Sequence, residues 1–339
     1  MWGSVDMQFI HGLVDAGRIT AEELRWLAHA RAHQIVHRFF NDVDTFGDIL
    51  RSSGAVVSGS ASLAFFIGPC HVRPGDLDIY VPAGQEANLL TWLTEQERYM
   101  PSSSWPMSDN LGERFDDFDD YCDVDGYRRI VRLERDGSWI DVVVIAGESA
   151  LLAISKFWTT ILFSFFTLDG YCCAYPEMLH LRRSMVAQCV LSSGLSQIVG
   201  PIMKYRTRGV RLFRSYRSWR EGTEGHCTGG TTCPSKWRFF GDRGCLIGFF
   251  DQDRSMEKDA ALLGRMHIAV VWRLGGEACY MGRCGNTGGY SGEQFELSEG
   301  FIDIAQRWLD TRSNTDLSAC ELRDLVRDRN FVVGRLYCH

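Results

Sequence analysis

The sequence predicts a mixed α+β fold, in which a small mixed sheet with flanking helices is followed by a helical and then a β-rich extension. Two patterns indicate this class: apolar residues recur every three or four positions near the N-terminus, and short alternating runs follow within residues 51–150. Of the 339 residues, 45% are hydrophobic and 23% are charged, as is typical of folded globular chains. We expect a helical cap over 1–50, a core over 51–150 and the extension over 151–339.

The first expected elements are helices. Residues 20–40 begin with Thr20 and Glu23 in capping-box spacing, and apolar residues then recur at helical intervals from Leu24 to Phe39. A shorter helix should follow and end at Gly54, because glycine commonly ends helices.

The core is expected to alternate strands and helices. The stretch "AVVSGSASLAFFI" (55–67) predicts a short strand, a tight turn and a helix, and "DLDIYVP" (76–82) predicts a strand closed by proline. Residues 87–100 should form a helix. The alternating runs "YRRIVRLERD" and "GSWIDVVVI" predict a hairpin with Asp136-Gly137 at its turn.

The extension is expected to be mainly helical over 148–220, with a buried helix over the apolar residues 157–168, which are too few to span a bilayer. Residues 221–295 are rich in glycine and cysteine with short strand-like runs, and 297–312 predict a final helix. The N-terminus lacks a signal-peptide pattern, so we expect a cytoplasmic protein without a membrane partner.

Two aspartates stand at the start of a strand that otherwise reads as buried. Asp76 and Asp78 point to one face because strand side chains alternate, and Asp141 on a neighbouring strand could complete a triad. Three converging carboxylates repel one another unless cations neutralise them. Hard oxygen ligands of this kind suit Mg²⁺ or Mn²⁺ bound together with nucleotide phosphates.

The turn at Gly59 and Ser60 fits the same chemistry. Glycine allows the backbone to come close to a phosphate, and the N-terminus of the following helix supplies N–H donors.

Gly-Ser at a strand-to-helix turn, an acid-x-acid pair on the next strand and a third acid on a later strand resemble the nucleotidyltransferase superfamily, the fold of DNA polymerase beta. The resemblance implies transfer of a nucleoside monophosphate from a nucleoside triphosphate to an acceptor hydroxyl, the acceptor being a small molecule, a protein or RNA. By the same resemblance the residues have these roles: Asp76, Asp78 and Asp141 hold metal and carry catalysis, and Gly59, Ser60, Lys156 and Thr160 contact the triphosphate.

The flanks "SGSASLAFF" and "PGDLDIYV" also resemble a group of uncharacterised fungal proteins with this fold, and that similarity continues through 174–184 and 204–213. Fifteen residues separate Ser60 from Asp76, more than is usual in the superfamily.

Three alternatives stay open. The acids could be solvated, with Asp141 paired to an arginine in the facing half of the hairpin such as Arg132. The chain could be a catalytically inactive binding protein with the same fold. It could also bind nucleic acid through the basic, aromatic-rich stripe at 204–220, although the net charge of −7 argues against a general nucleic-acid binder.

Two weaker signals remain. The acidic segment 115–125 does not have EF-hand spacing and is interpreted as an exposed loop. Cys227, Cys233 and Cys245 lie close in sequence but match no common zinc-finger spacing, so buried free thiols are preferred to a zinc site.

Overall fold

A computed structural model of the chain describes residues 5–102, 127–187, 199–213, 238–242, 244–250, 268–274, 291–296 and 333–334. Within these residues the protein has the expected α+β architecture, with a mixed eight-stranded sheet, two smaller sheets and helices around them. No helix in this part of the chain is both long and apolar enough to cross a membrane.

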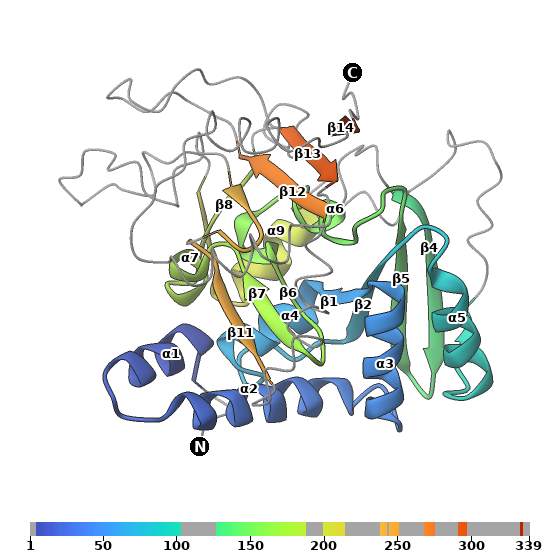
Figure 1. The fold of residues 1–339 in the computed structure, drawn as a ribbon, viewed down its shortest axis with the longest axis horizontal. Helices are drawn as coiled ribbons and strands as arrows, with labels where there is room; N and C mark the ends of the chain where they lie inside the picture. Colours follow the sequence, from blue (N-terminus) through green and yellow to red (C-terminus); the bar gives the residue numbers. More distant parts are fainter. Residues whose placement is uncertain are drawn as a thin grey trace.

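The N-terminal helices are α1 (Met7–Asp15), α2 (Ala21–Val36) and α3 (Val43–Ser53). The predicted capping box starts α2: the Thr20 hydroxyl accepts from the Glu23 N–H (3.1 Å), and the Glu23 carboxylate accepts from the Thr20 N–H (2.7 Å). Gly54 ends α3 with φ of 65°, as predicted. Figure 1 shows these helices along one side of the molecule.

The core follows the predicted order of elements, with a short additional strand after the fourth of them. These elements are β1 (Val56–Ser58), α4 (Gly59–Ile67), β2 (Asp76–Pro82), α5 (Glu86–Glu95), β3 (Met100–Pro101), β4 (Tyr127–Arg135) and β5 (Ser138–Ile145). The helix expected over 87–100 ends five residues early, and the chain then enters β3.

The β4–β5 hairpin confirms its predicted turn. Asp136 and Gly137 both have positive φ, 51° and 76°, as a two-residue hairpin turn requires. The turn pairs Arg135 with Ser138, and the same register brings Arg132 opposite Asp141.

The eight strands lie in the order β11-β7-β6-β1-β2-β5-β4-β3, and β2–β5 is the one parallel pair among them. Three of the strands come from beyond residue 150: β6 (Ser164–Phe166), β7 (Gly170–Cys173) and β11 (Leu246–Phe249). The main sheet therefore crosses the boundary expected between core and extension. Helix α4 packs against β1, β2 and β6.

The prediction of a buried helix over 157–168 is wrong. This segment is buried, but it contains only a 3₁₀ turn, η2 (Thr160–Leu162), before β6. An apolar run without periodicity does not distinguish a buried helix from a buried strand, and aromatic residues here favour the strand.

The wider prediction of mainly helical structure over 148–220 is also wrong for its described residues. Besides β6 and β7, they form α6 (Leu151–Ile154), α7 (Pro176–His180), β8 (Arg183–Met185), α9 (Val199–Thr207) and β9 (Arg211–Phe213). The two strands β8 and β9 pair in parallel as a separate small sheet.

The later part of the chain contributes a four-stranded sheet, as its strand-like runs suggested. Its strands lie in the order β10-β12-β13-β14, and the elements are β10 (Arg238–Phe239), β12 (Ile268–Arg273), β13 (Ser291–Glu296) and β14 (Val333–Gly334). In Figure 1, β12 and β13 lie on the side of the molecule opposite α1 and α2. The predicted loop at 115–125 and the predicted helix at 297–312 lie outside the described residues.

Candidate metal centre

The three predicted acids lie in adjacent strands at the middle of the main sheet. Asp78 on β2 has Ser58 of β1 opposite it on one side and Asp141 of β5 on the other. Arg132 of β4 lies opposite Asp141. These four residues form one row across the sheet, and residues in one row point to one face. Asp76 points to that face because it lies two positions before Asp78.

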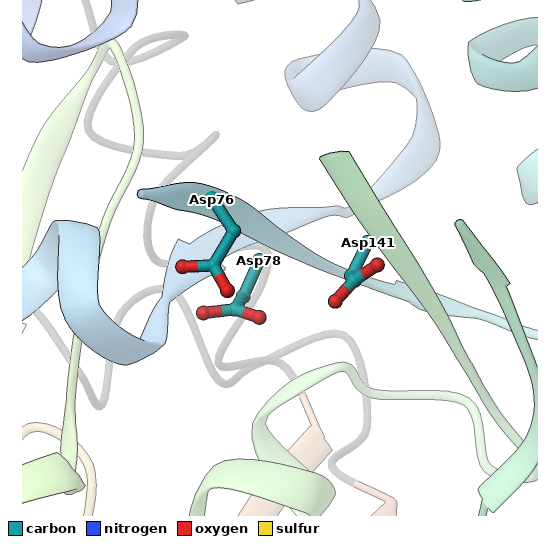
Figure 2. Close-up of side chains that lie close together, drawn as sticks. All are labelled: Asp76, Asp78 and Asp141. Atoms are coloured by element: carbon teal, nitrogen blue, oxygen red, sulfur yellow. The ribbon is translucent and has the colours of Figure 1, made fainter. Parts of the chain in front are cut away.

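The carboxylates converge. One oxygen from each of Asp76, Asp78 and Asp141 lies within 4.8 Å of the other two, so the three could hold a metal ion. Figure 2 shows Asp76 and Asp78 projecting from the same side of β2, with Asp141 directed toward them from the neighbouring strand. Asp141 is 3% exposed, whereas Asp76 and Asp78 are partly buried. Among the described residues, no other group of three His, Cys, Asp or Glu side chains converges in this way.

The bend between β1 and α4 packs directly against this cluster. Gly59 has φ of 63°, and a Cβ added to it would lie 2.0 Å from Oδ2 of Asp78. Only glycine therefore leaves room for that carboxylate in its present position. The Ser60 hydroxyl donates to Oδ1 of Asp76 (3.2 Å), which fixes the orientation of that carboxylate.

The cluster is electrostatically costly without a cation. Burial, together with the negative charges of Asp76 and Asp141, raises the pKa of Asp78 to about 8, although Lys204 and a backbone hydrogen bond from Ser60 act in the opposite direction. A donor set of three carboxylates with this repulsion fits a hard divalent cation such as Mg²⁺ or Mn²⁺.

Asp141 also has the arginine partner that the sequence left open. Nε and Nη2 of Arg132 donate to Oδ1 and Oδ2 of Asp141, each at 2.8 Å. This bidentate pairing raises the pKa of the Arg132 guanidinium above its ordinary value. The structure thus contains both the acid cluster and the ion pair, which the sequence presented as alternatives.

A cavity of about 180 Å³ lies against the three carboxylates. Gly59, Ser60 and Arg132 line it on the side of the sheet. Across from them, α9 contributes Lys204 and Tyr205, neighbours on the helix. The remaining lining residues are Tyr80, Phe157, Trp158, Leu162 and Pro201. The cavity therefore combines anionic, cationic and aromatic surfaces.

Lys156 and Thr160 are not among the residues that line this cavity. Lys156 is 5% exposed. The Thr160 hydroxyl hydrogen-bonds with the Ser184 hydroxyl (2.9 Å) and accepts from the Met185 N–H (3.0 Å), so it helps join η2 to β8. The segment expected as a helix over 157–168 forms η2 and β6 instead, so Thr160 does not project as helical spacing would place it.

Lys204, Tyr205 and Trp158 are site residues that motif reasoning missed. Lys204 begins the basic stripe, for which a triphosphate contact was one interpretation, and it alone of the stripe's basic residues lines the cavity among those described. Trp158 and Tyr205 are almost fully buried, and their rings lie 5.8 Å apart. Trp158 occurs within an apolar run that carries no local signal of a site.

The other sequence hypotheses are partly covered by the structure. The stripe is described only to Phe213, where Arg208 lies over the ring of Tyr205 and Arg211 over that of Phe213. Cys245 is buried, and its thiol donates to the Phe239 carbonyl (3.5 Å). Cys227 and Cys233 lie outside the described residues, so the choice between zinc and free thiols stays a prediction.

The row of acids, the glycine bend and the cavity are therefore the observations that bear on function. No protein-family model, curated protein or solved structure matches the chain.

Proposed function

We propose that this protein is a metal-dependent nucleotidyltransferase, which transfers a nucleoside monophosphate from a nucleoside triphosphate to an acceptor hydroxyl. One observation carries the proposal: the carboxylates of Asp76, Asp78 and Asp141 converge directly beside the Gly59-Ser60 bend. Hard oxygen ligands next to a backbone turn at a helix N-terminus form a suitable place for a cation and a phosphate chain.

In the proposed reaction, the acceptor oxygen attacks the α-phosphorus while the bond from that phosphorus to the bridging oxygen of the β-phosphate breaks. Pyrophosphate leaves with that bonding pair, and the proton of the hydroxyl passes to the carboxylate cluster. A bound Mg²⁺ or Mn²⁺ supplies charge neutralisation to the phosphates and brings the two reactants together. The remaining contributions come from the side chains and backbone of the chain itself.

The bend and α9 hold opposite sides of the triphosphate in this proposal. The N-terminus of α4, beginning at Gly59, presents backbone N–H groups and a positive dipole to the phosphates. Lys204, already close enough to lower the pKa of Asp78, supplies positive charge for the departing pyrophosphate. Alignment and electrostatic stabilisation of this kind are the main sources of catalysis in phosphate transfer.

The aromatic part of the cavity suits the base. Trp158 and Tyr205 line the cavity with rings tilted at 58° to each other, and aromatic rings bind bases by stacking without selecting one of them strongly.

The test is nucleotide turnover. Each of the four ribonucleoside triphosphates, labelled at the α-phosphate, is incubated with the protein and Mg²⁺, and both pyrophosphate release and label transfer are measured. Asp78→Asn should reduce turnover by at least about a hundredfold, because it weakens the cation site. Asp15→Asn is the matched control, since Asp15 is exposed at the end of α1 and should change nothing. Turnover that persists in Asp78→Asn would contradict the proposal.

The second candidate is a binding protein with the same cavity but no catalysis. The observation that favours it is the ion pair of Arg132, which occupies both oxygens of the third acid. Quenching of the tryptophan fluorescence of the protein by Mn²⁺–nucleotide complexes, without turnover of any of the four nucleotides, would support this candidate over the enzyme.

A further inference from the structure

The Arg132–Asp141 pair lies inside the cavity where the cation and nucleotide are proposed to bind. The Arg132 side chain is 35% exposed and lines the cavity, whereas the Asp141 side chain is 4% exposed. The guanidinium also lies over the ring of Trp139, with Cζ 5.9 Å from the ring centroid. It interacts electrostatically with Asp76 and Asp78 as well as with Asp141. The positive charge of Arg132 therefore interacts favourably with all three acids.

The pair is not needed to hold strands together. Arg132 and Asp141 are opposite partners in β4 and β5, which are already joined by a backbone ladder over their whole length. By contrast, Arg135 on the same strand donates to the carbonyls of Phe39 and Glu97, and so joins β4 to chain outside the sheet. Arg132 therefore contributes little to the stability of the fold beyond neutralising the charge of Asp141.

Both oxygens of Asp141 accept from Arg132 at 2.8 Å, so a cation that uses Asp141 meets a positive charge already bound there. A guanidinium binds phosphate oxygens in the same two-pronged way as it binds a carboxylate. When a triphosphate enters the cavity together with the cation, Arg132 gains a second set of anionic oxygens within its reach.

We infer that Arg132 is a nucleotide-binding residue that competes with the divalent cation for Asp141, and that it favours the cation–nucleotide complex over the bare cation. This inference rests on the proposed function, because it takes Asp76, Asp78 and Asp141 as the cation site. It assigns opposite effects to one side chain: Arg132 weakens binding of the cation alone and strengthens binding of the nucleotide complex.

The experiment measures both affinities in wild type and Arg132→Met. Mn²⁺ binding without nucleotide is followed by electron paramagnetic resonance, and binding of the Mn²⁺ complexes of the four ribonucleoside triphosphates by calorimetry. Arg132→Met should bind Mn²⁺ about tenfold more tightly, since a unit charge beside a divalent ion has that effect even in water. It should bind the nucleotide complex at least about tenfold more weakly, because a charge-assisted phosphate contact is lost.

Arg129→Met is the matched control. Arg129 is on the same strand and pairs with Glu86 (3.1 Å) on an exposed surface, so neither affinity should change. Arg132→Lys keeps the charge and loses the two-pronged contact, and it should shift Mn²⁺ affinity in the same direction by a smaller factor. That second variant keeps the test decisive if Arg132→Met does not fold.

Weaker or unchanged Mn²⁺ binding in both Arg132 variants would overturn the inference. If the wild type binds Mn²⁺ and Asp78→Asn abolishes that binding, the cation site stands and only the role of Arg132 fails. If the wild type binds no Mn²⁺, or if Asp78→Asn binds it equally well, the proposed function fails and the inference fails with it.

Discussion

Two buried acidic sites lie on opposite sides of the β4–β5 hairpin, and they are built in opposite ways. Glu97 is 3% exposed and accepts hydrogen bonds from the backbone N–H groups of Asn41 and Asp42, from the Asn41 amide and from Arg135. Burial raises the pKa of Glu97, but these donors outweigh it and the net effect is a lowered pKa. At the acid cluster, burial and neighbouring charges instead raise the pKa of Asp78.

The comparison separates an acid that stabilises the fold from acids that cost the fold stability. Glu97 has enough donors to be ionised at no penalty, and it joins the start of α3 to the strand of Arg135. Asp141 is paired with Arg132, whereas Asp78 is buried beside the like charges of Asp76 and Asp141. A protein retains such an arrangement where a cation completes it, and this is why we connect the cluster with function.

The largest expected effect is the loss of stability when Glu97 is replaced. Glu97→Ala should lower the free energy of unfolding by about 3 kcal/mol, because it removes the counter-charge of Arg135 and leaves two backbone N–H groups without their acceptor. Chemical denaturation measures this, with Glu95→Ala as the control on the exposed end of α5. Asp78→Asn should leave stability unchanged or raised without metal. A loss in Asp78→Asn as large as that in Glu97→Ala would remove the distinction between the two sites.

The second effect, smaller when counted per pH unit, is the pH dependence of stability. Between its ordinary pKa near 4 and about 8, Asp78 holds a proton in the folded state that it releases on unfolding. The free energy of unfolding should therefore fall as pH rises through this range, by up to about 1.4 kcal/mol per pH unit. Mg²⁺ favours the ionised cluster, so its stabilising effect should be larger at pH 8 than at pH 5.

Thermal denaturation at both pH values, with and without Mg²⁺, measures this dependence. Asp78→Asn removes the titrating group and should abolish the difference between the two pH values. Glu97 has a lowered pKa, so its contribution is nearly constant between pH 5 and pH 8 and is lost as the pH falls below its ordinary pKa. A Mg²⁺ effect that is equal at the two pH values would show that Asp78 does not control it.

The smallest change in stability is expected at the glycine bend. Gly59→Ala and Gly54→Ala both place a side chain at a positive φ, 63° and 65°, and this backbone strain by itself should cost about 1 kcal/mol at each position. At Gly54 the nearest atom to an added Cβ is Pro82 Cγ at 3.9 Å, whereas at Gly59 the Cβ would meet the Asp78 carboxylate. Only Gly59→Ala should therefore weaken Mn²⁺ binding. Equal Mn²⁺ affinities in the two variants would contradict the contact between bend and cluster.

Local rules predicted much of the acid site. The two-residue turn at Asp136-Gly137 fixes the register of the hairpin, so the sequence alone is enough to place Arg132 opposite Asp141. Alternation put Asp76 and Asp78 on one face. The strand-to-helix bend at Gly59 followed from the small residues between two apolar runs.

The far wall of the cavity could not be predicted in the same way. Lys204, Tyr205 and Trp158 reach the acids only because α9 packs across from the sheet, and no local pattern encodes that long-range contact. Lys156 and Thr160 were assigned to the triphosphate by the resemblance, and neither of them lines the cavity. Thr160 lies in the 3₁₀ turn η2 and hydrogen-bonds to Ser184 and Met185 of β8.

The parallel pairing of β2 with β5 also bears on how the sheet reaches its correct register. A slip of the β4–β5 hairpin against β2 by one residue would turn Asp141 and Arg132 together toward the face where Leu133 and Ile140 are now buried. A misaligned sheet of this kind is energetically unfavourable because it places charges on an apolar face. In the aligned sheet, every charge in the row has a neighbour of opposite sign or a place for a cation. The residues proposed for catalysis would then also disfavour incorrect strand pairing during folding.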